Sequence, residues 1–297
     1  MKVLLSDPMS GQGGTWGVIK ANERLSSPTF PMSFSNLLKK STLVGCMLSL
    51  LFVLLASRPP VPAQLDLILL IGQSNMAGRG ITDARSEPNN PNLWVINAKS
   101  QWVPAHDPLH FDKPTMVGVG PGLAFAEKWL ELNPGTNLGL VPCAVGGSSV
   151  DDWLPGARHA QTGIFPYDAM LQRVKEAQKH GKIKAILWHQ GESDSSPEKS
   201  RTYEKKLEAL FTRLRGDLHA RKTPILIGTL GDFFVEKNPN ASQINQIITN
   251  FPRSHRNVYA VSSAGLVHKG DTTHFDTPSA RALGIRYAEK LWEIQKN

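Results

Sequence analysis

Short, continuous apolar runs alternate with segments of helical periodicity from residue 65 onward. The apolar runs cover residues 65–72, 137–145, 183–189, 223–230 and 257–263. Continuous runs of this length are typical of strands that are covered on both faces, as in parallel sheets. Between them, the pattern predicts helices over residues 122–132, 167–180, 198–219, 240–250 and 278–294. Five strands with helical crossovers predict a doubly wound α/β domain whose site lies at the carboxyl ends of the strands.

The segment between the first strand and the first helix, residues 73–120, breaks this alternation. It is long, rich in proline and asparagine, and only weakly periodic. Loops of this length are often functional, so we expect substrate specificity to depend on it. The remaining chain shows no internal repeat, and we expect a single domain over residues 64–297.

The first 63 residues follow a different pattern. The basic pair Lys39-Lys40 precedes an apolar run from Leu43 to Ala56, and a proline-rich stretch follows. A run of this length is shorter than the roughly 20 residues that span a bilayer as a helix, but it suits the apolar core of a signal peptide. We interpret residues 1–63 as a signal peptide with a basic flank, or as an uncleaved signal anchor, and expect residues 64–297 to be secreted or anchored in the secretory pathway.

Composition and charge narrow the class of protein. Of the 297 residues, 40% are hydrophobic and 20% are charged, a composition typical of globular proteins. This composition and length exclude a disordered protein, a collagen-like protein and a small protein held together by disulfides. Residues 1–63 contribute half of the net charge of +8, and the basic residues form no nucleic-acid-binding motif. We therefore expect no nucleic-acid partner. Cys143 is the one cysteine after residue 63, and its apolar surroundings predict an inert thiol.

Polar and glycine-rich segments stand where predicted strands end. Ser74 directly follows the first strand, AVGGSS (144–149) follows the second, and WHQGESD (188–194) closes the third. Asp271 and His274 precede the last helix. Because the carboxyl ends of parallel strands meet at one edge of a sheet, these segments should meet, and the order Ser…Asp…His is that of one known type of catalytic triad. The alternatives are that Ser74 only caps a helix and that the glycines form a simple tight turn.

Other local interpretations remain open at this point. Met76 stands where the G-x-S-x-G elbow requires its second glycine, which disfavours a common α/β-hydrolase. Residues 106–112 hold two histidines and two aspartates, but their spacing matches no standard metal site, so we expect a polar loop. His268 or Asp276 could replace a member of the triad.

Four sequence blocks carry a family resemblance. In order along the chain they are GQSNMAGRG (72–80), AVGGSSVDDW (144–153), WHQGESD (188–194) and DTTHF (271–275), and GVGPGLAFAEKW (118–129) also fits. They resemble the SGNH hydrolase superfamily, and specifically the sialate O-acetylesterase-like domain of carbohydrate esterase family 6 and its plant relatives. The resemblance covers about residues 65–295. It implies a three-layer, flavodoxin-like SGNH hydrolase fold around a central five-stranded parallel sheet.

The resemblance also implies catalytic roles. Ser74 matches the family's nucleophile, Asp271 its acid and His274 its base. The backbone N–H groups of Ser74 and Gly147 match the oxyanion hole. No metal and no cofactor is implied.

The third block departs from the pattern of the wider superfamily. Many relatives in the wider superfamily supply a third oxyanion donor from an asparagine side chain, and Gln190 is the expected substitute here. Asn75 and Glu192 are expected to support the site, Glu192 through hydrogen bonds that fix the geometry of its loop.

The resulting expectation is a secreted serine esterase that removes O-acetyl groups from carbohydrate, acting on plant cell-wall polysaccharide through an acyl-enzyme. Trp102 and Trp153 could stack on sugar rings, although core packing is the simpler interpretation for each. The alternatives are a general short-chain carboxylesterase or lipase-like enzyme, and a non-catalytic glycan-binding protein on the same scaffold. A membrane partner is expected only if the N-terminal apolar segment remains uncleaved.

Overall fold

The computed structural model describes residues 61–87 and 90–296. The predicted signal peptide or anchor lies outside these ranges, apart from its last three positions. The described residues belong to one compact unit. Within them, no helix combines the length and the apolar character that a membrane crossing requires.

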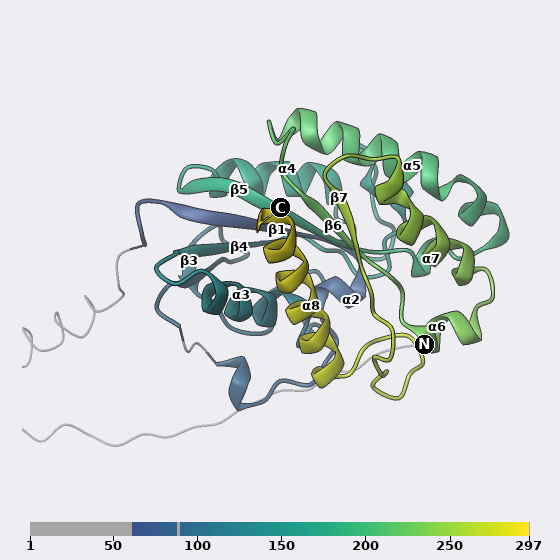
Figure 1. Cartoon of the computed structure of the whole chain (residues 1–297), viewed down its shortest axis with the longest axis horizontal. Helices are drawn as coiled ribbons and strands as arrows, with labels where there is room; N and C mark the ends of the chain where they lie inside the picture. Colours follow the sequence, from purple (N-terminus) through teal and green to yellow (C-terminus); the bar gives the residue numbers. More distant parts are fainter. Residues whose placement is uncertain (1–60, 88–89, 297) are drawn as a thin grey trace, which may run out of the picture. The chain divides into compact units, whose positions relative to one another are not determined.

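A seven-stranded sheet forms the centre of this unit, in the spatial order β3-β2-β4-β1-β5-β6-β7 (Figure 1). The strands are β1 (Leu65–Gly72), β2 (Leu93–Ile96), β3 (Trp102–Pro104), β4 (Leu138–Pro142), β5 (Gly181–His189), β6 (Ile225–Gly228) and β7 (Val258–Val261). Each pair of neighbours is parallel except β2 and β3, which are antiparallel. All five predicted strands are present, and among themselves they follow the 2-1-3-4-5 order of flavodoxin-like sheets.

The expectation of five strands was too low, because β2 and β3 both arise from the segment that we expected to be a long loop. β2 has four residues and β3 has three, and both lie between proline, asparagine and other polar residues that hide them within the segment. β2 is stabilised instead by pairing with β4, in which Gly139 lies opposite Trp94. Short strands of this kind depend on pairing and burial rather than on local propensity.

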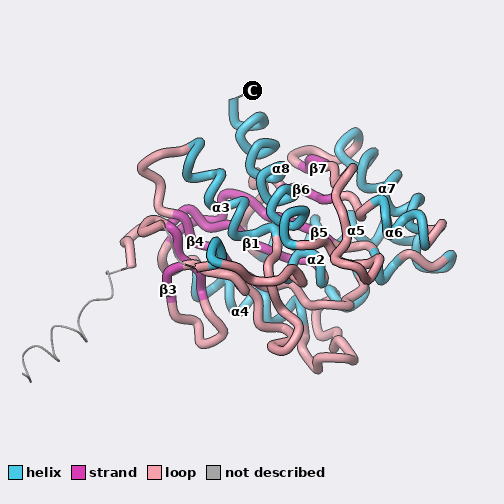
Figure 2. Tube along the Cα trace, turned by 90° about the horizontal axis from the view of Figure 1, so that it is seen from below, coloured by secondary structure: helices cyan, strands magenta, loops and turns pink. Residues whose placement is uncertain are grey.

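Helices cover both faces of the sheet, which gives the predicted three layers (Figure 1). One face carries α3 (Pro121–Leu132) and α8 (Thr277–Lys296), and the other carries α4 (Pro166–Ala177), α5 (Pro197–Asp217) and α7 (Ala241–Asn250). Figure 2 looks from below onto the face that α3 and α8 cover. Shorter helical segments are α2 (Ser74–Ala77), α6 (Asp232–Lys237) and the 3₁₀ turns at Ala84–Ser86, Val150–Trp153, Glu192–Asp194 and Phe251–Arg253. The five predicted helices are present with ends shifted by a few residues.

The burial of β1 explains its continuous apolar sequence. Leu67 and Leu69 pack into the core beneath α4, α5 and α7, whereas Ile68 and Leu70 pack into the core beneath α3 and α8. A strand covered on both faces has no polar side to present, so its sequence cannot alternate. β1 lies between β4 and β5, and the turns that follow these three strands therefore lie side by side at one edge.

Gly72 ends β1 at a point where a side chain would not fit. Its φ of +128° is unfavourable for other residues, and a Cβ there would lie 2.1 Å from the carbonyl oxygen of His189. The close approach of β1 and β5 at this position directs the chain into α2, whose first residue is Ser74.

Candidate active site

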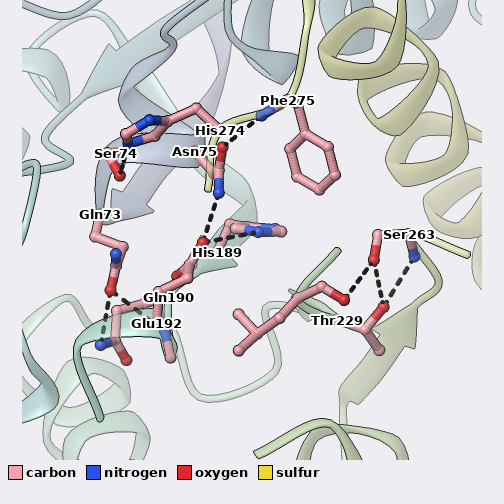
Figure 3. A network of polar contacts seen from close by, with 12 residues as sticks. Gln73, Ser74, Asn75, His189, Gln190, Glu192, Thr229, Ser263, His274 and Phe275 are labelled. Carbon is pink, nitrogen blue, oxygen red and sulfur yellow. Dashed lines mark hydrogen bonds and ion pairs between the residues drawn. The ribbon is translucent and has the colours of Figure 1, made fainter. Parts of the chain in front are cut away.

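Ser74, His274 and Asp271 form one hydrogen-bonded line at this edge of the sheet. Figure 3 shows Ser74 beside His274. Ser74 Oγ lies 3.0 Å from His274 Nε2, and His274 Nδ1 lies 2.7 Å from Asp271 Oδ2. Ser74 is buried at the start of α2, whereas His274 and Asp271 lie on the loop between β7 and α8. The structure thus brings together the three residues that the sequence predicts as a triad, although the histidine and the serine are 200 positions apart.

The other two candidates for the triad hold the loop instead. The Nδ1 atom of His268 accepts hydrogen bonds from the backbone N–H groups of Gly270 and Thr272. Asp276 accepts a hydrogen bond from the backbone N–H of Ser279 in the first turn of α8. No hydrogen bond or ion pair joins either side chain to that of Ser74 or His274.

Asp271 is held in its charged form. Partial burial raises its pKa, but the backbone N–H and the ring of His274, together with the backbone N–H of Thr273, donate hydrogen bonds that outweigh this effect. The pKa of Asp271 falls to about 2. Its carboxylate can therefore orient the imidazole and balance a positive charge on it at neutral pH.

His274 is poised to accept a proton. Burial lowers its pKa, and the positive charges of Arg79 and Lys269 add to this effect. Asp271 opposes it, but the net pKa of His274 remains below the usual 6.5. The ring is therefore neutral at pH 7, the form that a general base requires.

A glycine turn after β4 lies beside Ser74. Gly147 has a left-handed φ of +86° and lines the cleft around the serine. The N–H of Gly146 donates a hydrogen bond to Asp112 Oδ2 at 2.6 Å, and Arg79 Nη2 lies 3.4 Å from the same oxygen. Both charged side chains are 2% exposed. This buried ion pair therefore fixes the turn that carries the Gly147 N–H.

Gln190 does not lie where the family pattern led us to expect it. Its side chain is fully buried, and its Nε2 atom donates to Asp194 Oδ2 at 2.5 Å and to Ser148 O and Gln73 Oε1 at 3.2 Å each. Gln190 is not among the residues that line the cleft, whereas Gln73, one of its acceptors, is. Its amide is therefore committed to supporting Gln73, and the structure disagrees with a role as oxyanion donor.

Asn75 and Glu192 lie in contact beneath the serine (Figure 3). Asn75 Nδ2 donates to Glu192 Oε1 at 2.6 Å. Burial raises the pKa of Glu192 to about 7, although the hydrogen bond from Asn75 opposes this shift. Glu192 Oε1 also lies 3.9 Å from Nε2 of His189, a fully buried ring whose pKa burial lowers to about 4.

The cleft above Ser74 has a volume of about 300 Å³. Its walls combine polar groups of the glycine turn and the His274 loop with the side chains of Lys113, Met116 and Phe234. Trp102 and Trp153 are not among the lining residues. Trp153 is fully buried and donates its Nε1–H to Ser148 Oγ, and Trp102 packs edge-on against His180. Core packing therefore accounts for both tryptophans.

The model of one protein family, described as carbohydrate esterase, sialic acid-specific acetylesterase, matches residues 64–293. The chain belongs to this family. It is accordingly a carboxylic ester hydrolase of the carbohydrate acetylesterase class, and the resemblance seen in its sequence blocks is confirmed.

Individual relatives agree with this assignment. The esterase is 33% identical over 253 residues to a probable carbohydrate esterase of Arabidopsis thaliana, At4g34215, which covers 77% of this chain and 91% of the relative. The crystal structure of the At4g34215 protein superposes with a TM-score of 0.69 at 30% identity, over 78% of this chain and 98% of that one.

More distant structures share the fold. NanS has a TM-score of 0.63 at 17% identity, with 80% of this chain and 99% of that chain covered. XAC1771, a carbohydrate acetylesterase from Xanthomonas citri, has a TM-score of 0.57 at 19% identity, with 75% of this chain and 55% of that chain covered.

The titratable residues of the segment 106–112, which had been weighed as a metal cluster, are in different environments in the esterase. Asp112 pairs with Arg79, whereas burial lowers the pKa of His110 to about 4 and raises that of Asp107 to about 7. In the described part of the chain, no three His, Cys, Asp or Glu side chains are grouped as metal ligands would be.

Cys143 is partly exposed beside a neighbouring cavity of about 210 Å³, and its pKa is raised to about 12, chiefly by burial.

Sequence reasoning missed the ion pair of Arg79 and Asp112. The two residues are 33 positions apart, and no local pattern links them. The one available signal is the position of Arg79, a charged residue among small and apolar ones directly after the serine turn.

Proposed function

We propose that the esterase removes O-acetyl groups from polysaccharide through a serine mechanism in which Ser74 is the nucleophile, His274 the general base and Asp271 the acid that orients it. The observation that carries this proposal is the unbroken line of contacts from Ser74 Oγ through His274 to Asp271, at 3.0 and 2.7 Å. These distances are within the hydrogen-bond reach that nucleophile activation requires.

In the first half of the reaction, His274 Nε2 takes the proton of Ser74 as Oγ attacks the ester carbonyl carbon. The carbonyl oxygen becomes an oxyanion, which accepts hydrogen bonds from the backbone N–H groups of Ser74 and Gly147. The intermediate then collapses, the bond to the sugar oxygen breaks, and the proton on His274 passes to that oxygen. Ser74 is left acetylated and the sugar hydroxyl is free.

In the second half, His274 removes a proton from water as the water oxygen attacks the acetyl-enzyme. The bond to Ser74 Oγ breaks, the proton returns to Oγ, and acetate leaves. Loss of one oxyanion donor in such a mechanism slows the reaction by roughly 10²–10³-fold. The buried pair of Arg79 and Asp112 supports this part of the proposal because it fixes the Gly146–Gly147 turn.

The substrate that we propose is acetylated cell-wall polysaccharide in the extracellular space of a plant. Two observations support this choice. The 33% identical relative is a probable carbohydrate esterase of Arabidopsis thaliana. The sequence of residues 1–63 also has the charge and hydropathy pattern of a signal peptide or anchor.

The test is the release of acetate from acetylated xylan and acetylated pectin by the full chain, with Ser74→Ala beside it. Ser254→Ala is the matched control, because Ser254 is exposed on a turn and contacts His255 rather than the cleft. We expect the wild type and the control to release acetate and Ser74→Ala to release none. The polymer that yields more acetate then identifies the substrate class.

Two other results would change the assignment. If p-nitrophenyl acetate is cleaved through Ser74 but neither polymer is, the enzyme is a general short-chain carboxylesterase. If the folded wild type hydrolyses nothing yet binds either polymer, the protein is a glycan-binding module. Equal acetate release by Ser74→Ala would refute the serine mechanism itself.

A further inference from the structure

The loop that carries His274 has little regular structure of its own. It connects β7 to α8, and Gly270 and Thr272 take positive φ values of +111° and +55°. Asp271 bonds to the backbone of Thr273 and His274, but it belongs to the same loop and cannot fix that loop relative to Ser74. Contacts with other elements must therefore set the distance from the ring of His274 to the serine.

Asn75 makes such contacts from the helix that carries the serine. Its Nδ2 atom donates to the carbonyl oxygen of Thr273 at 3.0 Å, and its Oδ1 atom accepts from the N–H of Phe275 at 3.1 Å. One buried amide therefore bonds to the residue before His274 and to the residue after it. Because Asn75 directly follows Ser74, these two hydrogen bonds tie the backbone around the base to the backbone of the nucleophile.

Glu192 determines which way this amide faces. It accepts the second Nδ2 hydrogen of Asn75 at Oε1, 2.6 Å away. With the amide reversed, Asn75 Oδ1 would face two acceptors, Glu192 Oε1 and the Thr273 carbonyl, while Nδ2 would face the N–H of Phe275. The Glu192 side chain is 4% exposed, so water cannot readily replace it as the acceptor.

We infer that Asn75 and Glu192 act together as a positioning pair that holds His274 Nε2 within hydrogen-bond reach of Ser74 Oγ. Neither side chain reacts with substrate in this scheme. This inference rests on the proposed roles of Ser74 and His274. Other contacts also hold the loop, including the hydrogen bond from Lys269 N–H to His274 O and the burial of the Phe275 ring. These anchor the loop to itself and to the core, whereas the pair anchors it to the serine.

The experiment measures kcat and KM for p-nitrophenyl acetate with the full chain and four variants: Asn75→Ala, Glu192→Ala, the double variant and Glu192→Gln. A displacement of a catalytic group by about 1 Å can slow a reaction by about 10²-fold. We expect Asn75→Ala to lower kcat by about 10- to 100-fold with KM within about twofold of the wild type. Glu192→Gln keeps an acceptor oxygen for Asn75, and we expect it to retain kcat within about threefold, whereas Glu192→Ala loses about tenfold.

The double variant tests whether the two residues act as a unit. If they do, its kcat equals that of Asn75→Ala within about threefold, because the second substitution removes nothing further. If the two losses multiply, the pair does not act as a unit and the inference is overturned. The matched control is Asn133→Ala, which removes a hydrogen bond to Trp129 O at the end of α3 and should leave kcat unchanged.

Two further measurements keep the result interpretable. Urea unfolding of each variant separates a loss of folded protein from a loss of kcat. If the alanine variants do not fold, Asn75→Asp replaces them: it keeps the acceptor for Phe275 N–H and removes both donors. A kcat for Asn75→Asp equal to that of Glu192→Gln overturns the inference. Ser74→Ala, run in parallel, tests the proposed function separately, since its full activity would refute that function whatever the other variants do.

Discussion

Replacing Glu192 by glutamine should change the free energy of unfolding in a pH-dependent way. Relative to the wild type, the variant should gain stability as the pH rises from 5 to 8. Burial raises the pKa of this carboxyl group from 4.5 to about 7 in the folded protein, although the Asn75 hydrogen bond lowers it. Between these two values, the folded state binds a proton that the unfolded state does not. The wild type therefore loses stability as the pH rises through this range, and the loss levels off above pH 7. Glutamine does not titrate and has no such loss.

The magnitude follows from the size of the shift. Raising the pKa of Glu192 from 4.5 to about 7 corresponds to about 3 kcal/mol at about 1.4 kcal/mol per pKa unit, and most of this free energy accrues between pH 5 and pH 8. We take the melting temperature of Glu192→Gln minus that of the wild type. For a domain of this size, this difference should be about 5–10 °C higher at pH 8 than at pH 5. Asp107 and His189 are buried and also have shifted pKa values, but they are present in both proteins and largely cancel in the difference.

The assay is urea unfolding of both proteins, followed by tryptophan fluorescence at several pH values from 5 to 8. Glu131→Gln serves as the control, because the Glu131 side chain is 67% exposed and its ion pair with Lys128 lies on the surface. The free energy of unfolding of this control should stay within about 0.5 kcal/mol of the wild type at every pH. Parallel curves for Glu192→Gln and the wild type would refute the argument, because they would mean that ionising Glu192 costs no more in the fold than in water.

Three further predictions concern the reaction and its support. Asp271→Asn should lower kcat by about 10⁴-fold in p-nitrophenyl acetate hydrolysis, because the imidazole loses the partner that orients it; a loss below tenfold would contradict the triad. The value of kcat/KM should fall as the pH is lowered, with a midpoint below pH 6.5, because the pKa of His274 lies below that value. A midpoint above pH 6.5 would contradict the argument that burial lowers this pKa. Asp112→Asn leaves the buried charge of Arg79 unpaired and should destabilise the fold by about 3–5 kcal/mol in urea unfolding; a change below 1 kcal/mol would show that water screens the pair.

The layered architecture could be derived from the sequence because its causes are local. The run of residues 65–72 is apolar at nearly every position, and only a strand covered on both faces explains this. The same reasoning found four more strands and the five main helices. It failed for β2 and β3. β2 is held by pairing with β4, which lies more than forty positions further along the chain, and β3 pairs with β2.

The site divides in the same way. Ser74, Asp271 and His274 could be selected because each follows or precedes an element that the pattern predicts, and because parallel strands bring their ends to one edge. The orientation of Gln190 could not be derived in this way. Its residue type suits an oxyanion donor, but Asp194 and Gln73 supply acceptors on the other side, and the amide turns toward them.

The sequence by itself therefore determined the α/β class, the edge at which the site lies and the residue types that meet there. The tertiary structure decided how those side chains are held: the amide of Asn75 across the two neighbours of His274, and Asp112 beneath the glycine turn. The physical reason is that hydrophobic periodicity reflects burial, a property of each segment alone. The direction of a polar side chain depends instead on partners from distant parts of the chain, and only folding brings those partners within hydrogen-bond distance.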